Sequence, residues 1–370
     1  MEQKIITINE NYCLLDEYLK ALRIKRLMLV CGGSVRFLRI NDYFNTLRER
    51  LGIEIVRFSD FQPNPSYDSV IKGVRVFNEN QCEAVLAVGG GSAMDVAKCI
   101  KFYANADIPD DSVLTEVDVN GIPLIAMPTT AGSGSEATRY AIIYCKGEKQ
   151  TVTHESIIPS AVIMDASVLE TLPKYQKSST MADALCHAIE SFWAVDSTEE
   201  SRESAREAIL QILKYKDLYF ANDPKGNEKM LWAAYTAGRA INVTRTTAGH
   251  AMCYKLTSLY GLAHGHAAAL CVSKLWQYML DNIDKCSDPR GEQYLRKTFD
   301  ELAECFGGKS AEQGAEKFQE ILTSLELYVP VPNENHFAVM IPSVNPARLK
   351  NNPIELDSKA IEKIYRSIFE

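Results

Sequence analysis

Residues 85–100 read VLAVGGGSAMDVAKCI, and this stretch decides what kind of domain the first half of the chain forms. A short apolar run ends in three glycines, and a serine and a run of helical spacing follow. That order predicts a buried strand, a tight turn and a helix. Glycine lets the backbone approach an anion closely, and the first turn of a helix presents unpaired N–H groups. The stretch therefore indicates an anion-binding turn, with a turn that binds nothing as the alternative, because the GxGxxG spacing of a standard dinucleotide fold is absent.

The rest of the first half repeats the pattern of a strand followed by a helix. Strands are predicted for the apolar runs 26–33, 53–61, 82–91, 122–130 and 161–167, and helical spacing is present at 35–50 and 67–80. Strands that alternate with helices favour a parallel sheet covered on both faces. After about residue 166 helical periodicity dominates, with helices predicted at 178–195, 199–219, 228–243, 296–305 and 358–369. Residues 325–356, rich in proline and asparagine, are expected to form a long loop.

Composition excludes several classes of function. The 370 residues are 46% hydrophobic and 24% charged, which is ordinary for a soluble protein of two domains. The net charge of −8, without a basic stripe, gives no sign of a nucleic-acid surface. We expect neither a signal peptide nor a membrane span, because no long uninterrupted apolar stretch occurs. The ten cysteines are scattered, and several lie in apolar runs, which favours reduced thiols and a cytoplasmic location.

A second loop rich in glycine and hydroxyl groups follows the predicted strand 122–130. Its sequence, MPTTAGSGSEATRY, occupies residues 127–140 and offers exposed donors with little side-chain bulk. Two such loops at the carboxyl ends of parallel strands build a crevice where open sheets bind ligands. A nucleotide is therefore the expected ligand of the first domain.

Four residues of the second half could hold a metal. Asp183 and His187 are spaced i, i+4 on a predicted helix, so both side chains lie on one face. His250 and His264 would stand about 21 Å apart on one unbroken helix, so they join this pair only if the segment 255–263 reverses the chain. Three imidazoles and a carboxylate suit Fe²⁺ or Zn²⁺. The alternative is a solvated or capping aspartate with unrelated histidines.

Four motifs in this order resemble those of the iron-containing (group III) alcohol dehydrogenases. They are GGGSAMDVAK, PTTAGSGSEAT, DALCHAIES and HAMCY with the following AHGHA, and the resemblance covers most of the chain. It implies a Rossmann-like nucleotide-binding α/β domain at 1–165 and an all-α metal-binding and substrate domain at 166–370, together the dehydroquinate synthase-like fold. It also implies a homodimer and a metal, Fe²⁺ with Zn²⁺ as the alternative.

The resemblance carries roles to individual positions of this sequence. The metal ligands it implies are Asp183, His187, His250 and His264. The cofactor-binding residues it implies are Gly90, Gly91, Ser92, Asp95, Thr129, Thr130, Ser133 and Lys149.

This chain departs from the family pattern at three positions. Tyr254 stands where the family has a histidine beside the metal, and we expect it to act as an acid or an orienting group, with mere space filling as the alternative. Gly32 stands where members that prefer NAD often have an aspartate that would repel a 2′-phosphate. NADP(H) is therefore favoured, with NAD(H) as the alternative. His266 follows His264 closely, and we expect it behind the ligands or on the surface.

The expected substrate is a small aldehyde that is reduced to a primary alcohol. Arg245, Lys255, Asn242 and Thr246 surround the HAMCY motif and suit a tetrahedral oxyanion, the alternative being a surface arginine paired with a carboxylate. The segment INVTRTTAGHAMCYKLT is similar to the branch of the family that reduces phosphonoacetaldehyde to 2-hydroxyethylphosphonate. The alternatives are a general short-chain alcohol dehydrogenase, a glycerol-dehydrogenase- or dehydroquinate-synthase-like enzyme, and a redox-inactive nucleotide- or metal-binding protein.

Overall fold

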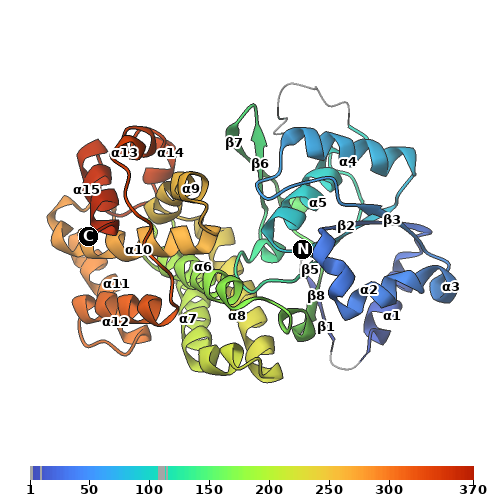
Figure 1. The fold of residues 1–370 in the computed structure, drawn as a ribbon, viewed down its shortest axis with the longest axis horizontal. Coiled ribbons are helices and arrows are strands. Elements are labelled where there is room, and N and C mark those ends of the chain that lie inside the picture. The colour runs from blue at the N-terminus through green and yellow to red at the C-terminus, as the bar shows by residue number, and fades with distance from the viewer. Residues whose placement is uncertain (1–2, 9–10, 107–112, 114–115) are drawn as a thin grey trace. The chain divides into compact units, whose positions relative to one another are not determined.

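The computed structural model describes residues 3–8, 11–106, 113 and 116–370. The chain forms two compact units (Figure 1). The sheet unit comprises the residues up to Thr130 together with Gly134–Thr171, and the helical unit comprises Ala131–Ser133 and Leu172–Glu370. The first unit thus ends six residues after the boundary expected at residue 165. Within the described part of the chain, no helix is both long and apolar enough to cross a membrane.

The sheet unit contains a parallel sheet of six strands among its described residues. Its order is β1 (Lys4–Ile8), β8 (Ala161–Asp165), β5 (Leu124–Pro128), β4 (Ala84–Gly89), β2 (Arg26–Cys31) and β3 (Glu54–Phe58). The five predicted strands are therefore confirmed. The sequence reasoning missed β1, whose five residues are too few to show a periodicity and whose partner β8 lies far along the chain. It also missed the antiparallel hairpin of β6 (Tyr140–Cys145) and β7 (Glu148–Thr153).

Helices cover both faces of this sheet, which explains why its strands are continuous apolar runs. Figure 1 shows α4 (Tyr67–Glu79) and α5 (Gly91–Tyr103) on one side and α1 (Cys13–Leu22), α2 (Arg39–Asn45) and α3 (Leu47–Leu51) on the other. Every residue of β5 and β8 is buried. The helix predicted at 35–50 is divided into a 3₁₀ turn, α2 and α3. The break between α2 and α3 falls at Thr46. The Thr46 hydroxyl donates a hydrogen bond to the Tyr43 carbonyl, and such a bond competes with the backbone hydrogen bonds of a helix.

The register of the strands brings three loops to one edge of the sheet. Cys31 of β2 pairs with Val88 of β4, and Gly89 of β4 pairs with Pro128 of β5. Because all three strands are parallel, the residues that follow them emerge at the same edge. Gly32, Gly90 and Thr129 therefore follow neighbouring strands at the carboxyl edge of the sheet, where open parallel sheets bind ligands.

The helical unit is built around α6 (Lys174–Trp193), which packs against α7 (Glu199–Phe220), α8 (Pro224–Thr244) and α10 (His264–Asp281). From Met181 to Trp193 every residue of α6 is buried, and the alanines of this run allow close helix packing. The rings of Trp276 and Phe299 each form a T-shaped contact with the ring of Trp193. The other helices are α9 (Ala248–Tyr260), α11 (Glu292–Cys305), α12 (Ala311–Ser324), α13 (Glu334–Met340), α14 (Pro346–Leu349) and α15 (Ser358–Ile368).

Two sequence predictions for this unit need correction. The expected loop at 325–356 contains α13 and α14, which are too short to show a helical period but begin with the signals Asn333 and Pro346. The expected chain reversal exists, but it does not occupy the whole of 255–263. α9 continues to Tyr260, and Gly261, with φ of +66°, ends it in the left-handed conformation three residues before α10 begins.

Candidate metal centre and cofactor-binding loops

α6 places two of the predicted metal ligands on one buried face. Asp183 and His187 lie one helical turn apart, and their exposed fractions are 5% and 6%. Nδ1 of His187 is buried and has no hydrogen-bond partner among the described residues. A buried imidazole nitrogen without a partner is costly in a folded protein, and a bound cation would remove that cost.

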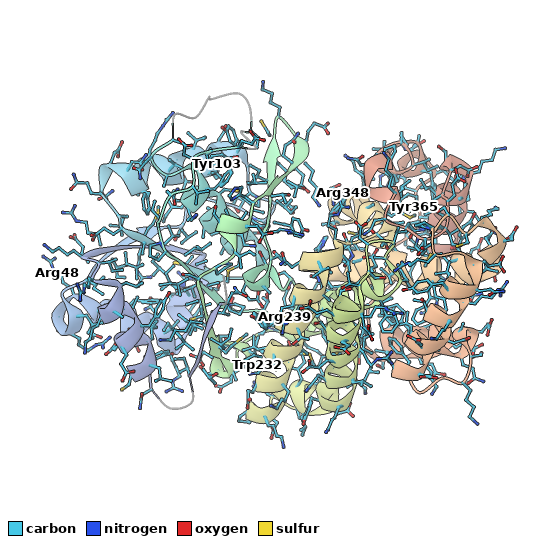
Figure 2. The ribbon with its side chains drawn as sticks, turned by 180° about the vertical axis from the view of Figure 1, so that it is seen from behind. Arg48, Tyr103, Trp232, Arg239, Arg348 and Tyr365 are labelled. Carbon is cyan, nitrogen blue, oxygen red and sulfur yellow. The ribbon has the colours of Figure 1, made fainter. Side chains whose placement is uncertain are left out.

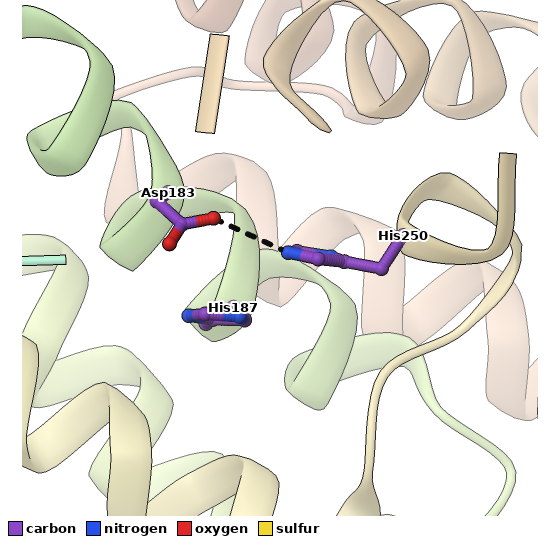
Figure 3. A group of neighbouring side chains, drawn as sticks. All are labelled: Asp183, His187 and His250. Atoms are coloured by element: carbon purple, nitrogen blue, oxygen red, sulfur yellow. Dashed lines mark hydrogen bonds and ion pairs between the residues drawn. The ribbon is translucent and has the colours of Figure 1, made fainter. Parts of the chain in front are cut away.

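The other two predicted ligands come from the starts of α9 and α10. Nε2 of His250 lies 3.4 Å from Oδ1 of Asp183, and the His250 ring stacks on that of His187 with centroids 4.5 Å apart (Figure 3). One ligand atom from each of these three residues lies within 4.8 Å of the others. Nε2 of His264 lies 3.9 Å from the same Asp183 oxygen, and this side chain is 43% exposed. The fold thus brings the four residues together. Asp183, His187 and His250 are buried, and His264 is the member of the group that solvent reaches.

The electrostatics of this group favour a bound cation. Burial alone would raise the pKa of Asp183, but His187, His264 and His250 outweigh it and hold that pKa well below its usual range. Burial alone would lower the pKa of His250, but Glu190 and Asp183 outweigh it and raise the pKa to about 9. Two buried carboxylates therefore draw positive charge to this place. Because oxygen and imidazole nitrogen donors converge there, the residues present fit Fe²⁺ or Zn²⁺.

Glu190 supports this group, and the sequence reasoning missed it. Its side chain is fully buried on α6, seven residues after Asp183 and three after His187, so the helical spacing DxxxHxxE was the available signal. Oε2 accepts a hydrogen bond from Nδ1 of His250, while Oε1 accepts bonds from the backbone N–H and the hydroxyl of Thr247, at 3.1 and 2.6 Å. Glu190 therefore fixes the His250 ring and caps the first turn of α9.

Two glycines permit the close packing of this group. A Cβ at Gly265 would lie 2.1 Å from the Ser179 carbonyl oxygen and 2.5 Å from Cβ of Asp183. A Cβ at Gly249 would lie 2.4 Å from a Val272 methyl and 3.0 Å from Oε1 of Glu190. Glycine is needed at both positions because the helices that carry the candidate ligands approach more closely than a side chain allows.

Tyr254, where the family pattern has histidine, lies against a candidate ligand. Its ring is nearly parallel to that of His264, with centroids 5.8 Å apart and an interplanar angle of 15°. Its hydroxyl accepts a hydrogen bond of 2.7 Å from Nη1 of Arg348, whose guanidinium also lies 5.3 Å from the ring centroid. Arg348 comes from α14 (Figure 2), inside the stretch expected to be a loop, so no sequence signal pointed to it.

His266 is buried instead of lying on the surface. Its Nε2 donates to the Tyr328 carbonyl at 2.8 Å, so Nδ1 accepts from the Tyr175 hydroxyl at 3.0 Å. Both ring nitrogens are thus engaged away from the candidate metal group. His266 therefore joins residues 328 and 175 to the start of α10.

The predicted anion-binding residues lie on α8, on α9 and in the turn between them. Arg245 ends α8 with φ of +61°, is 63% exposed in its side chain, and pairs with Asp196 at 2.5 Å. The Thr246 carbonyl accepts a bond from Asn351, and Asn242 and Lys255 are half-buried on α8 and α9. The charge of Arg245 is therefore already balanced by a carboxylate.

In the sheet unit, the fold brings most of the predicted cofactor-binding residues together. A Cβ at Gly90 would lie 3.2 Å from Oγ1 of Thr130, and the Thr129 N–H bonds to the Gly89 carbonyl at 3.0 Å. Gly91 and Ser92 form the first turn of α5, which presents backbone N–H groups. Ser133 belongs to the short stretch Ala131–Ser133 that packs with the helical unit.

Asp95 is half-buried behind this turn, within a polar cluster. The Ser135 hydroxyl donates to it at 3.2 Å, and Lys98 donates to the hydroxyls of Ser135 and Thr138. Burial raises the pKa of Asp95 to about 6, although Lys98 and Lys149 both lower it. Lys149 thus lies close enough to Asp95 to lower the pKa of its carboxyl. Through Ser135, Asp95 fixes the second loop, residues 127–140, to α5. It therefore supports the predicted cofactor-binding residues.

Two family models match this chain. The model for iron-containing alcohol dehydrogenase matches residues 3–166, and the model for the C-terminal part of the same family matches residues 177–369. The chain belongs to the iron-containing alcohol dehydrogenase family. It is therefore an oxidoreductase that acts on alcohols.

Individual relatives within the family differ in substrate. The chain is 29% identical to the phosphonoacetaldehyde reductase of Streptomyces viridochromogenes, over 80% of this chain and 79% of that protein. It is 31% identical to the NAD-dependent methanol dehydrogenase of Bacillus methanolicus, over 67% of this chain and 66% of that protein.

A solved structure supports the architecture of this iron-containing alcohol dehydrogenase. The sulfoacetaldehyde reductase of Bifidobacterium kashiwanohense in complex with NAD⁺ has a TM-score of 0.85 to the chain and covers 100% of it and 97% of its own length. At 24% identity this likeness shows the fold alone. The predicted fold, a Rossmann-like domain followed by an all-helical domain, is confirmed.

Proposed function

We propose that this alcohol dehydrogenase uses a reduced nicotinamide cofactor to convert a small aldehyde that carries a tetrahedral anionic group into the primary alcohol. Phosphonoacetaldehyde, reduced to 2-hydroxyethylphosphonate, is the favoured substrate. The observation that carries the proposal is the buried group of Asp183, His187 and His250, braced by Glu190, in a chain of this family. The similarity to a phosphonoacetaldehyde reductase over 80% of the chain supports the substrate.

Most of the residues that would hold each partner of the reaction belong to one unit of the chain. Asp183, His187, His250 and His264 would hold Fe²⁺, with Zn²⁺ as the alternative, and the bound ion supplies a Lewis acid for the carbonyl oxygen. The cofactor, which supplies the hydride, would be held by Gly32, Gly90, Gly91, Ser92, Thr129, Thr130, Ser133 and Lys149, with Asp95 in support. NADP(H) is favoured because Gly32 places no carboxylate after β2, and NAD(H) is the alternative.

Tyr254 is proposed to guide the proton that the new alkoxide needs. Its oxygen accepts the hydrogen bond from Arg348, so the hydroxyl directs its own hydrogen elsewhere. The ring is held parallel to that of His264, which limits where the hydroxyl can lie. In this arrangement Tyr254 orders a water molecule that protonates the alkoxide. The oxyanion site predicted at Arg245, Lys255, Asn242 and Thr246 stays a prediction, and the ion pair of Arg245 with Asp196 weakens the case for that residue.

A homodimer and a reducing, cytoplasmic location are also proposed. All ten cysteines are free and most are buried, which suits a reducing compartment. The dimer rests on the family resemblance.

A general short-chain alcohol dehydrogenase is the second candidate. It is favoured by the identity of 31% to a methanol dehydrogenase, slightly above the 29% to the phosphonoacetaldehyde reductase. The deciding experiment is a spectrophotometric screen of the Fe²⁺-loaded protein with phosphonoacetaldehyde, sulfoacetaldehyde and propanal, each with NADPH and with NADH. We expect the highest kcat/KM for phosphonoacetaldehyde with NADPH. Efficient reduction of propanal with no reduction of either charged aldehyde would support the second candidate instead.

A further inference from the structure

We propose that Arg348 is the residue that binds the anionic end of the substrate. This inference rests on the proposed function, in which the substrate is an aldehyde with a tetrahedral anion. The sequence favoured Arg245 for binding the anion, and the inference assigns that role to Arg348 instead. Arg348 lies in α14, within the stretch that the sequence predicted to be a loop. Arg348 thereby becomes the residue that determines specificity for charged over uncharged aldehydes.

The position of Arg348 relative to the candidate metal ligands supports this assignment. Its guanidinium contacts Tyr254 at the hydroxyl, at 2.7 Å, and over the ring face, at 5.3 Å. The same ring stacks on His264, whose Nε2 lies 3.9 Å from Asp183. One aromatic ring therefore separates the guanidinium from a candidate ligand.

The chemistry of the guanidinium fits the anion. Arginine offers five N–H donors in a planar fork that matches the spacing of phosphonate and sulfonate oxygens. Two contacts with Tyr254 hold the Arg348 guanidinium in one orientation. The side chain therefore loses less conformational entropy when an anion binds. Arg348 is also half-buried, which reduces the screening of its charge by solvent. Arg245, by contrast, is exposed to solvent over 63% of its side chain.

Matched arginine variants test the assignment. Arg348→Met, Arg245→Met and Arg239→Met each remove one positive charge from the helical unit. Arg239, labelled in Figure 2, lies on α8. It is the control because its side chain is 52% exposed and its guanidinium lies 3.9 Å from the Glu200 carboxylate. Kinetics of the metal-loaded variants are measured with phosphonoacetaldehyde and with propanal. Calorimetric titration with methylphosphonate measures anion binding without turnover. Thermal unfolding establishes that each variant is folded.

We expect Arg348→Met to raise KM for phosphonoacetaldehyde about 10- to 100-fold, since a hydrogen bond between charged groups is lost, and to leave KM for propanal within about threefold. Methylphosphonate affinity should fall by a similar factor. Arg348→Lys should recover part of both losses, because the charge returns without the fork. Arg239→Met should resemble the unmodified protein.

The outcomes separate this inference from the proposed function. If the unmodified protein prefers phosphonoacetaldehyde and Arg348→Met keeps that preference and its methylphosphonate affinity, the assignment is overturned while the proposed function stands. A selective loss in Arg245→Met alone would move the anchor to Arg245. Equal losses in kcat for both aldehydes in Arg348→Met would show that Arg348 only positions Tyr254. If the unmodified protein neither prefers charged aldehydes nor binds methylphosphonate, both proposals fail.

Discussion

Glu190 on α6 accepts a hydrogen bond from Nδ1 of His250 on α9, so a carboxylate from one helix sets the ring of a candidate metal ligand on another. A carboxylate can only accept at this nitrogen, which therefore keeps its hydrogen and leaves Nε2 as the atom that can give an electron pair to a metal once its own proton is displaced. Nε2 is the atom that faces Asp183, at 3.4 Å. The tautomer that a metal requires is thus selected by the fold.

Glu190→Gln tests this relationship. The amide oxygen can keep the bonds from Thr247, but the amide NH₂ then faces Nδ1 of His250 and forces the proton onto Nε2. We expect metal affinity to fall about 10- to 100-fold, measured by competition with a chelator. The exposed Glu203→Gln on α7 is the control, and unchanged affinity in Glu190→Gln would mean that Glu190 only caps α9.

Metal removal and replacement should reveal the role of His250. Dialysis against a chelator should abolish aldehyde reduction, and Fe²⁺ should restore it in the unmodified protein. His250→Ala should neither bind the metal with comparable affinity nor recover activity, because one buried donor beside Asp183 is lost. Metal content measured by elemental analysis alongside activity checks this, and full metal occupancy in His250→Ala would contradict the ligand set.

Gly265→Ala should separate α6 from α10. The added methyl would lie 2.1 Å from the Ser179 carbonyl and 2.5 Å from the Asp183 side chain, so the helices must move apart. We expect a loss of about 1–3 kcal/mol in the free energy of unfolding and a marked loss of metal affinity. Gly226→Ala is the control, because its Cβ would lie 2.4 Å from the Leu218 backbone between α7 and α8. It should cost similar stability and leave metal affinity of the folded protein unchanged.

Glu136 should make the stability of the sheet unit depend on pH. Burial raises its pKa to about 7, despite the lowering by its own backbone N–H and by Lys98, and its Oε1 has no hydrogen-bond partner among the described residues. The pKa of Glu136 is thus higher in the folded protein than in the unfolded chain. The stabilisation that this difference contributes to folding is fully present below the ordinary pKa of 4.5 and is lost as pH rises through 7. This loss is on the order of 3 kcal/mol. Asp95, with its pKa raised to about 6, acts in the same direction at lower pH.

Glu136→Gln removes the titrating group and should remove this part of the loss. Urea unfolding at pH 5 and pH 8 measures it, with the exposed Glu148→Gln on β7 as control. The difference in stability between the two pH values should shrink in Glu136→Gln and persist in Glu148→Gln. An identical pH dependence in all three proteins would show that the Glu136 carboxyl titrates near its ordinary value.

Gly32→Asp should penalise NADPH relative to NADH. The backbone at Gly32 is extended, with φ of −79°, and a Cβ there meets nothing within 4 Å, so the substitution is accommodated without strain. A carboxylate after β2 would repel a 2′-phosphate and accept bonds from a ribose hydroxyl. The ratio of KM values for the two cofactors measures the effect. Gly121→Asp adds the same charge in an exposed loop and should not change the ratio; an equal change in both variants would remove the basis for favouring NADP(H).

Local sequence predicted those parts of the site that depend on residues close in the chain. The glycine turn after β4 follows from one short stretch, and the shared face of Asp183 and His187 follows from helical spacing. The same spacing also carries Glu190 to that face, although it was overlooked. The short elements β1, α13 and α14 were missed because four to seven residues seldom contain a clear period.

The sequence by itself determined five of the six described strands of the parallel sheet, the two glycine loops and the pair Asp183–His187, because these rest on periodicity and on steric rules of the backbone. Only the tertiary structure decided that Glu190 meets His250 sixty residues away, that Arg348 meets Tyr254 ninety-four residues away, and that Arg245 pairs with Asp196. Such contacts depend on how whole helices pack, and packing is fixed by many weak interactions summed over the unit. No local spacing specifies which distant side chains that sum will bring together.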